Sequence, residues 1–123
     1  MRLSPLSGLS YREWRDYILH LPLEYKDYNN FVEKYGSFIS GKPAPEAVIR
    51  ICSYFEIVGI LLKRKLLSTD IVWDFYGMYT TMMAKLLMPL IEGFREEYNV
   101  REFEHGEYLF NEMKKREQQL AKI

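Results

Sequence analysis

Apolar side chains recur every three or four positions along most of the chain, which is the spacing that places them on one face of a helix. The strict alternation of a half-buried strand is rare by comparison. The periodic segments predict helices at about residues 10–21, 23–38, 45–66, 70–98 and 106–122. The sequence therefore predicts an all-α fold, a compact helical bundle of about five helices.

Capping and helix-breaking residues lie at the ends of these segments. Ser10 and Glu13 form a capping box, in which each side chain bonds the backbone N–H of the other residue. Pro22 disfavours helical geometry in the residue before it, and Asn99 can adopt the left-handed conformation that ends many helices. Pro89 cannot donate an internal hydrogen bond, so we expect the long fourth helix to be kinked there.

A loop with two prolines and a glycine, at residues 40–45, divides the chain. We expect a more polar N-terminal helical hairpin at residues 1–40 and a helical core at residues 45–123. Together they are expected to form a single domain, because a chain of 123 residues falls within the usual size of one domain.

The two central segments are the most apolar. The segment at residues 45–66 is apolar nearly all round, which is typical of a helix at the centre of a bundle. In the segment at residues 70–98, the side chains expected to face the core are Val72, Phe75, Tyr79, Met82, Leu86 and Leu90. Gly77, Thr81 and Ala84 form a strip of small side chains on another face, which favours close packing of a neighbouring helix.

Charge and cysteine content limit the classes of protein. The 17 Lys and Arg residues balance 17 Asp and Glu residues, which argues against a broad electrostatic surface for nucleic acid or anionic lipid. Cys52 is the only cysteine, so an intramolecular disulfide is excluded and a reducing compartment is favoured. No apolar run approaches the ~18 residues of a membrane span, and the first ten residues lack the apolar core of a signal peptide. We expect a cytoplasmic protein without a membrane span.

Four features follow one another along roughly residues 45–115: a Phe-Glu-x-x-Gly helix, a basic turn, a second helix ending near a proline, and a late Phe-Glu-x-Leu element whose close spacing is altered here by residues 105–109. These features are residues 55–59, residues 63–65, Pro89 and residues 103–104, in that order. The similarity is carried mainly by the segments at residues 50–67 and 72–77. In this order the features resemble an uncharacterised helical domain family of bacteria and archaea. The resemblance implies a domain of unknown function, with no catalytic residues to carry over.

Glu56 is the most conspicuous polar residue, because it lies in the middle of the most apolar segment. A buried carboxylate needs a partner, and its pKa is usually perturbed. One interpretation is a general acid or base. The other is a structural carboxylate in a buried polar site, paired with Arg50, with Lys63 or with one of the tyrosines. The structural interpretation is preferred.

Other chemistry finds little support in the sequence. His20 and His105 are the only histidines, and neither has a partner at the spacing of a known metal motif. Cys52 lies within a helix on an apolar face, where thiols are typically inert. Neither a nucleophile elbow nor a glycine-rich phosphate loop is present. We therefore expect no metal, no cofactor and no enzymatic activity.

Two surface features remain. The side chains of Lys63, Arg64, Lys65 and Lys85 could form a basic patch for phosphates, but the preferred interpretation is a helix C-terminus whose cations are solvated. Methionines on the fourth helix are either an adaptable binding surface or core filler. They are Met78, Met82, Met83 and Met88.

The preferred function is a non-catalytic helical protein-interaction module, with self-association as one form of that interaction. The reason is an excess of apolar and aromatic faces on two helices. The alternative is a small nucleic-acid-binding regulator that uses the basic turn. An enzyme built around Glu56 comes last, because the companion residues are missing.

Overall fold

The computed structural model describes residue 12 and residues 24–122 of the chain. This part contains four complete helices and no strand: α2 (Tyr28–Tyr35), α3 (Pro43–Lys63), α4 (Thr69–Tyr98) and α5 (Glu104–Ala121). The all-α class predicted from the sequence is therefore confirmed. The predicted count was about five helices, and the first of those, at residues 10–21, lies outside the described residues except for residue 12.

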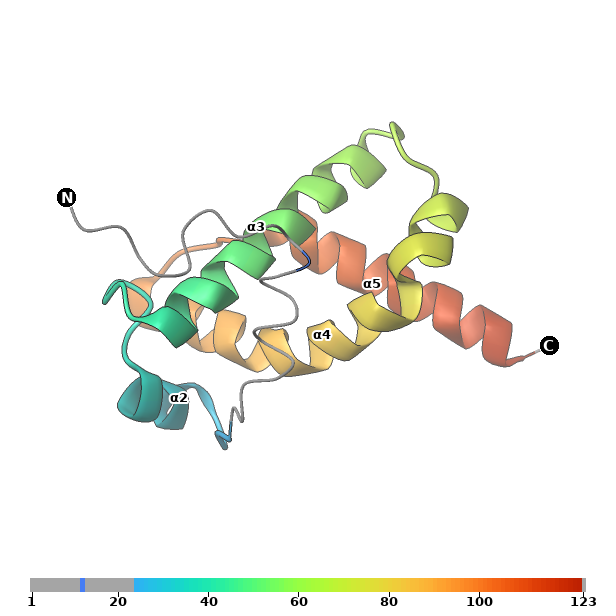
Figure 1. Ribbon diagram of the computed structural model, residues 1–123. Helices are drawn as coiled ribbons and strands as arrows, with labels where there is room; N and C mark the ends of the chain where they lie inside the picture. Colours follow the sequence, from blue (N-terminus) through green and yellow to red (C-terminus); the bar gives the residue numbers. More distant parts are fainter. Residues whose placement is uncertain (1–11, 13–23, 123) are drawn as a thin grey trace.

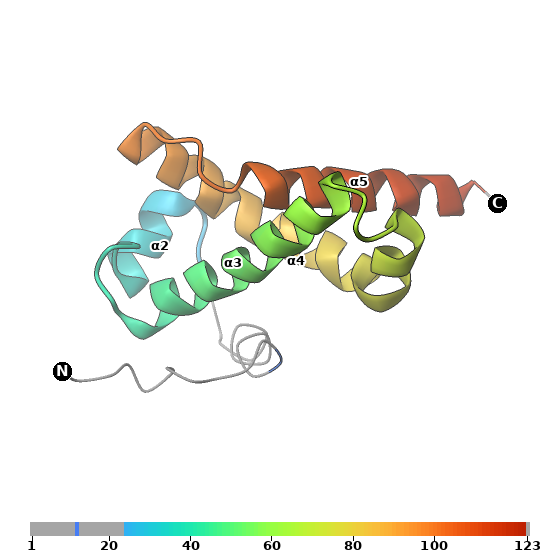
Figure 2. The same ribbon diagram turned by 90° about the horizontal axis from the view of Figure 1, so that it is seen from above.

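The three long helices pack around one another, and α2 closes one end of the group (Figures 1 and 2). α5 makes its most extensive contacts with α3 and also packs on α4, although α4 separates α3 from α5 in sequence. Figure 1 shows the last turns of α5 projecting past the rest of the described chain. The contact between α3 and α5 is therefore the long-range joint that closes the fold.

α2 is shorter than the helix predicted at residues 23–38, because local signals end it on both sides. The side chain of Asp27 accepts a hydrogen bond from the Asn30 backbone at 2.8 Å and so caps the first turn. Gly36 has φ of 104° and ends the helix. Phe31, on the buried face of α2, stacks on Phe38 with ring centroids 5.2 Å apart.

α3 ends three residues before the predicted end at residue 66. Lys65 adopts the left-handed conformation, with φ of 61°. The backbone N–H of Leu66 then reaches back to the carbonyl of Leu61 at 2.9 Å, which is the six-residue bond of a Schellman motif. The basic turn is therefore first of all a helix C-terminus.

α4 begins and ends close to the predicted residues. The Ser68 side chain accepts a hydrogen bond from the Ile71 backbone at 3.1 Å, and Asn99 has φ of 51° at the other end. Helical residues continue without a break through Pro89. Figure 1 shows the first turns of α4, in yellow, at an angle to the rest of the helix.

The predicted core face of α4 was partly wrong. Val72 and Leu90 are buried as expected, but the side chain of Phe75 is 76% exposed and that of Met82 is 59% exposed. The residues buried along α4 are Val72, Gly77, Thr80, Thr81, Met83, Leu87, Leu90 and Ile91. Small side chains allow close approach, so α4 turns its small-residue strip inward and leaves an apolar stripe outside.

The described helices are not long and apolar enough to cross a membrane. Even α3, the most apolar of the described helices, lacks the combination of length, hydropathy and low charge that crossing a bilayer requires, and the same holds for the other helices described.

Candidate functional site

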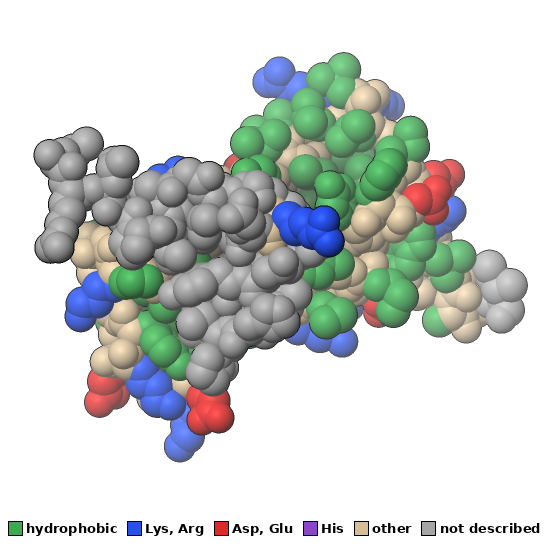
Figure 3. All heavy atoms as spheres, in the orientation of Figure 1, with side chains coloured by type: hydrophobic (Ala, Val, Ile, Leu, Met, Phe, Trp, Pro, Cys, Tyr) green, Lys and Arg blue, Asp and Glu red, His purple; other side chains and the backbone are tan. Residues whose placement is uncertain are grey.

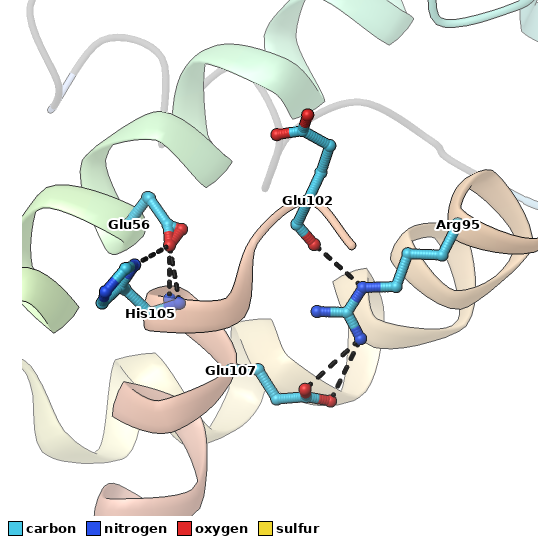
Figure 4. A network of polar contacts seen from close by, with 6 residues as sticks. Glu56, Arg95, Glu102, His105 and Glu107 are labelled. Atoms are coloured by element: carbon cyan, nitrogen blue, oxygen red, sulfur yellow. Dashed lines mark hydrogen bonds and ion pairs between the residues drawn. The ribbon is translucent and has the colours of Figure 1, made fainter. Parts of the chain in front are cut away.

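Glu56 extends from α3 to the first turn of α5 (Figure 4). Its Oε1 atom accepts hydrogen bonds from the backbone N–H of His105 at 2.6 Å and of Gly106 at 3.3 Å. The same oxygen lies 3.1 Å from Nδ1 of the His105 ring. Glu56 therefore contacts the second and third residues of α5, which are the positions that an N-cap side chain normally serves.

The first turn of α5 needs a hydrogen-bond acceptor from elsewhere, because its own N-cap residue has no side chain that can accept a hydrogen bond. Phe103 occupies the N-cap position with φ of 76°, and its side chain makes no capping hydrogen bond. The first N–H groups of a helix have no partner inside the helix. Glu56 supplies an acceptor from another helix, and its negative charge meets the positive end of the α5 dipole.

Two contacts around Glu56 fix the distance between α3 and α5. A Cβ atom built on Gly59 would overlap the backbone carbonyl of His105, so only glycine permits this close approach. Phe55 packs edge-to-face on Phe110 of α5 with ring centroids 5.2 Å apart. We call Phe55, Glu56 and Gly59, together with the α5 residues that they contact, the α3–α5 joint.

Arg95 holds the loop that leads into the joint. Its Nε atom donates to the backbone carbonyl of Glu102 at 2.8 Å, and Nη1 lies 3.3 Å from both carboxylate oxygens of Glu107 (Figure 4). One side chain from the last turns of α4 thus ties together the loop before α5 and the first turn of α5. Sequence analysis did not single out Arg95, and its only local signal was a cation near a helix C-terminus.

The chemistry available at the joint is limited. Oε1 of Glu56 already faces three nitrogen atoms, whereas Oε2 is buried and has no hydrogen-bond partner among the described residues. A cavity of about 390 Å³ lies beside the joint, and its lining includes Glu56, Cys52 and Glu102 among mostly apolar side chains. Burial, with a smaller contribution from the charge of Glu56, raises the pKa of the Cys52 thiol to about 12. The thiol is therefore protonated near neutral pH, which is the inert form predicted from the sequence.

Two of the predicted partners of Glu56, Arg50 and Lys63, contact other residues instead. The side chain of Arg50 is 57% exposed and lies 3.9 Å from Glu46, one turn earlier on α3. Six residues separate Arg50 from Glu56, about one and two-thirds helical turns, so the two side chains leave α3 in different directions. Lys63 instead lies over the ring of Tyr108, 5.7 Å from its centroid. The polar site therefore consists of Glu56 and His105 and does not include Arg50. It is only partly buried, because the side chain of Glu56 is 24% exposed and that of His105 is 40% exposed.

The basic residues lie in two places. Lys63, Arg64 and Lys65 are exposed together at the C-terminal end of α3. Lys85 is exposed too, but it lies 16 residues after Thr69, roughly 24 Å along α4. A surface formed by the basic turn alone carries three charges, and their position at a helix C-terminus also places them next to its negative dipole end.

Part of the surface carries many exposed apolar side chains. Hydrophobic side chains gather over the end of α3 and the start of α4 (Figure 3). On α4 they form a stripe at intervals of four, three and four residues, which we call the α4 outer face. It consists of Ile71, Phe75, Met78 and Met82, with exposed fractions of 50%, 76%, 69% and 59%.

The methionines of α4 divide between the two alternatives that the sequence left open. Met78 and Met82 lie on the α4 outer face, whereas Met83 is 1% exposed and belongs to the core. Nearby, Tyr54 and Tyr76 line a cavity of about 140 Å³, whose walls come from α3, α4 and, through Leu109, α5. The described residues contain no group of three or more His, Cys, Asp or Glu side chains arranged to hold a metal ion.

A family model described as Domain of unknown function (DUF4760) matches residues 5–113. The chain belongs to this family. The match begins well before residue 45, where the resemblance seen in the sequence began, and it covers the whole α3–α5 joint. No curated protein and no solved structure matches the chain.

The motifs that carried the resemblance acquire a structural meaning in this DUF4760 domain. The Phe-Glu-x-x-Gly sequence of α3 and the late Phe-Glu element meet at the α3–α5 joint. A Cβ atom built on Gly106 would overlap the ring of Phe103, so glycine at this position allows the Phe103 ring to pack against the first turn of α5. The sequence predicted that Glu56 needs a partner, but not that the partner lies 49 residues further along the chain.

Proposed function

We propose that this DUF4760 domain is a non-catalytic protein-interaction module that binds its partner through the α4 outer face. The observation that carries the proposal is the stripe of four exposed apolar side chains on a helix that is otherwise well packed. Exposed apolar side chains occur singly on most proteins, whereas a continuous stripe is typical of an interaction site.

The residue types of the stripe suit this role. Phe75 is 76% exposed, so it can bury a large apolar area in a partner at a small cost in side-chain entropy. Met78 and Met82 flank it, and methionine adapts its shape to irregular surfaces. Stripes with spacings of three and four residues are the pattern by which one helix packs into a groove or onto another helix.

A non-catalytic role agrees with the geometry of the polar residues. In the α3–α5 joint, Oε1 of Glu56 accepts hydrogen bonds from the backbone of His105 and Gly106 and lies 3.1 Å from Nδ1 of the His105 ring. Their arrangement supports the helix start rather than a reacting group. The proposal therefore assigns Glu56 to stability and the α4 outer face to function.

The test compares the parent chain with a double variant, Phe75→Ser with Met78→Ser. Ile39→Ser is the matched control, because Ile39 is 75% exposed but lies outside the α4 outer face. Complex formation is measured by size-exclusion chromatography with light scattering and by affinity capture from the source cells.

We expect a complex, either with itself or with a captured protein, that the double variant loses and the control keeps. Identical behaviour of the parent and the double variant, both as monomers and in the proteins that they capture, would overturn the proposal. All three substitutions are at exposed positions, so circular dichroism should show unchanged folding.

A further inference from the structure

The structure places opposite charges along one edge of the α4 outer face. Asp74 lies near its start and Lys85 just beyond its end, and both side chains are exposed. They are 11 residues apart, about three helical turns, so they lie on the same edge of the helix. Asp70 is already held within its own chain, with Oδ1 2.5 Å from Nη2 of Arg116.

We infer that the partner of the α4 outer face is a second copy of this chain, packed antiparallel along α4 about a twofold axis near Met78. The inference rests on the proposed function and names its partner. In an antiparallel pair the same edges of the two helices face each other. Asp74 of each copy then lies near the partner's Lys85, and this contact occurs twice.

A parallel arrangement does not give these contacts. In a parallel pair each edge of one helix faces the opposite edge of its partner, so Asp74 and Lys85 of the two copies lie on opposite sides of the seam. Only the antiparallel pair brings each Asp74 to the partner's Lys85, and these two contacts favour that direction. The charge pattern of α4 therefore selects the antiparallel direction.

The apolar spacing fits the same partner. Ile71, Phe75, Met78 and Met82 follow the four-three-four interval of the seam positions in a two-helix coiled coil, over about 16 Å of helix. About a twofold axis near Met78, Phe75 of one copy lies beside the partner's Met82. The formal net charge of the chain is zero, so two copies approach without overall repulsion.

The first experiment measures the mass of the full chain by sedimentation equilibrium from about 1 to 100 µM, where a micromolar dimer dissociates measurably. We expect a concentration-dependent dimer in the parent and in Ile39→Ser. The double variant Phe75→Ser with Met78→Ser should weaken it at least a hundredfold, because two seam residues on each copy lose their apolar contacts. A dimer unaffected by the double variant would overturn the inference.

The second experiment tests the direction by exchanging charges. Asp74→Lys and Lys85→Asp should each weaken self-association by about tenfold, because both salt contacts become repulsive. Mixing the two single variants should restore a dimer that contains one copy of each, since the introduced lysine of one copy then faces the introduced aspartate of the other. The variant with both exchanges should also dimerise like the parent. Absence of preferential mixing would overturn the antiparallel arrangement.

The two proposals fail in different ways. A chain that stays monomeric at about 100 µM, yet captures a cellular protein in a manner that depends on Phe75, would overturn the second-copy partner and leave the interaction module intact. A monomer whose captured proteins are the same for the parent and for Phe75→Ser with Met78→Ser would overturn both.

Discussion

Removal of the Glu56 carboxylate should destabilise the fold by releasing the start of α5. Oε1 of Glu56 accepts bonds from the backbone of His105 and Gly106 and faces the positive end of the helix dipole. Loss of a capping side chain costs ~1 kcal/mol, with an upper limit near 2. The interaction of a partly buried charge with a helix end adds about 0.3 to 1 kcal/mol.

Glu56→Ala loses both contributions and should reduce the free energy of unfolding by about 2 kcal/mol. Glu56→Gln keeps an amide oxygen that can accept from the same N–H groups, so it should lose only the part due to charge, up to ~1 kcal/mol. In a domain of this size, the alanine variant corresponds to a fall in Tm on the order of 10 °C.

The assay is urea denaturation followed by circular dichroism, with Glu46→Gln as the control. Glu46 is on the same helix, but its ion pair within the described part of the chain is the 3.9 Å contact with the exposed Arg50. The control should change the free energy of unfolding by less than about 0.5 kcal/mol. An alanine variant as stable as the control would refute the capping role of Glu56.

Three further outcomes follow from the backbone and the thiol. Gly59→Ala should lose about 1 to 3 kcal/mol of stability, because its Cβ would overlap the carbonyl of His105, and an unchanged urea midpoint would contradict this contact. Lys65→Gly should raise stability by about 1 kcal/mol, because glycine removes the strain at φ of 61°, whereas Arg64→Gly at φ of −82° should lower it. Cys52, with a pKa raised to about 12, should react with a thiol reagent at pH 8 at about a thousandth of the rate seen in the unfolded chain, and equal rates would contradict its burial.

Helix ends that depend on local residues were predicted well. The fourth helix was expected at residues 70–98 and is Thr69–Tyr98, because Ser68 and Asn99 act within one turn of their own position. The end of α3 was placed too late, since Lys65 adopts a left-handed conformation that its residue type does not suggest. The prediction therefore failed where the conformation was unusual for the residue.

The partner of Glu56 and the outward face of α4 could not be predicted in the same way. Both depend on which helices meet, and periodicity within one helix carries no such information. α4 has two faces that satisfy an apolar repeat, and close packing of Gly77, Thr80 and Thr81 decides which one is buried. The apolar stripe that the pattern assigned to the core thus became the surface to which the function is assigned.

The α3–α5 joint also affects the order in which the chain folds. Glu56 and His105 are 49 residues apart, and all of α4 lies between them. Closing so long a loop costs conformational entropy before any contact of the joint is made. Local helices and the turn between α3 and α4 can form earlier, because they need no such closure. Because the α3–α5 joint forms after these local elements, we expect that weakening the Glu56 cap accelerates unfolding and leaves the refolding rate nearly unchanged.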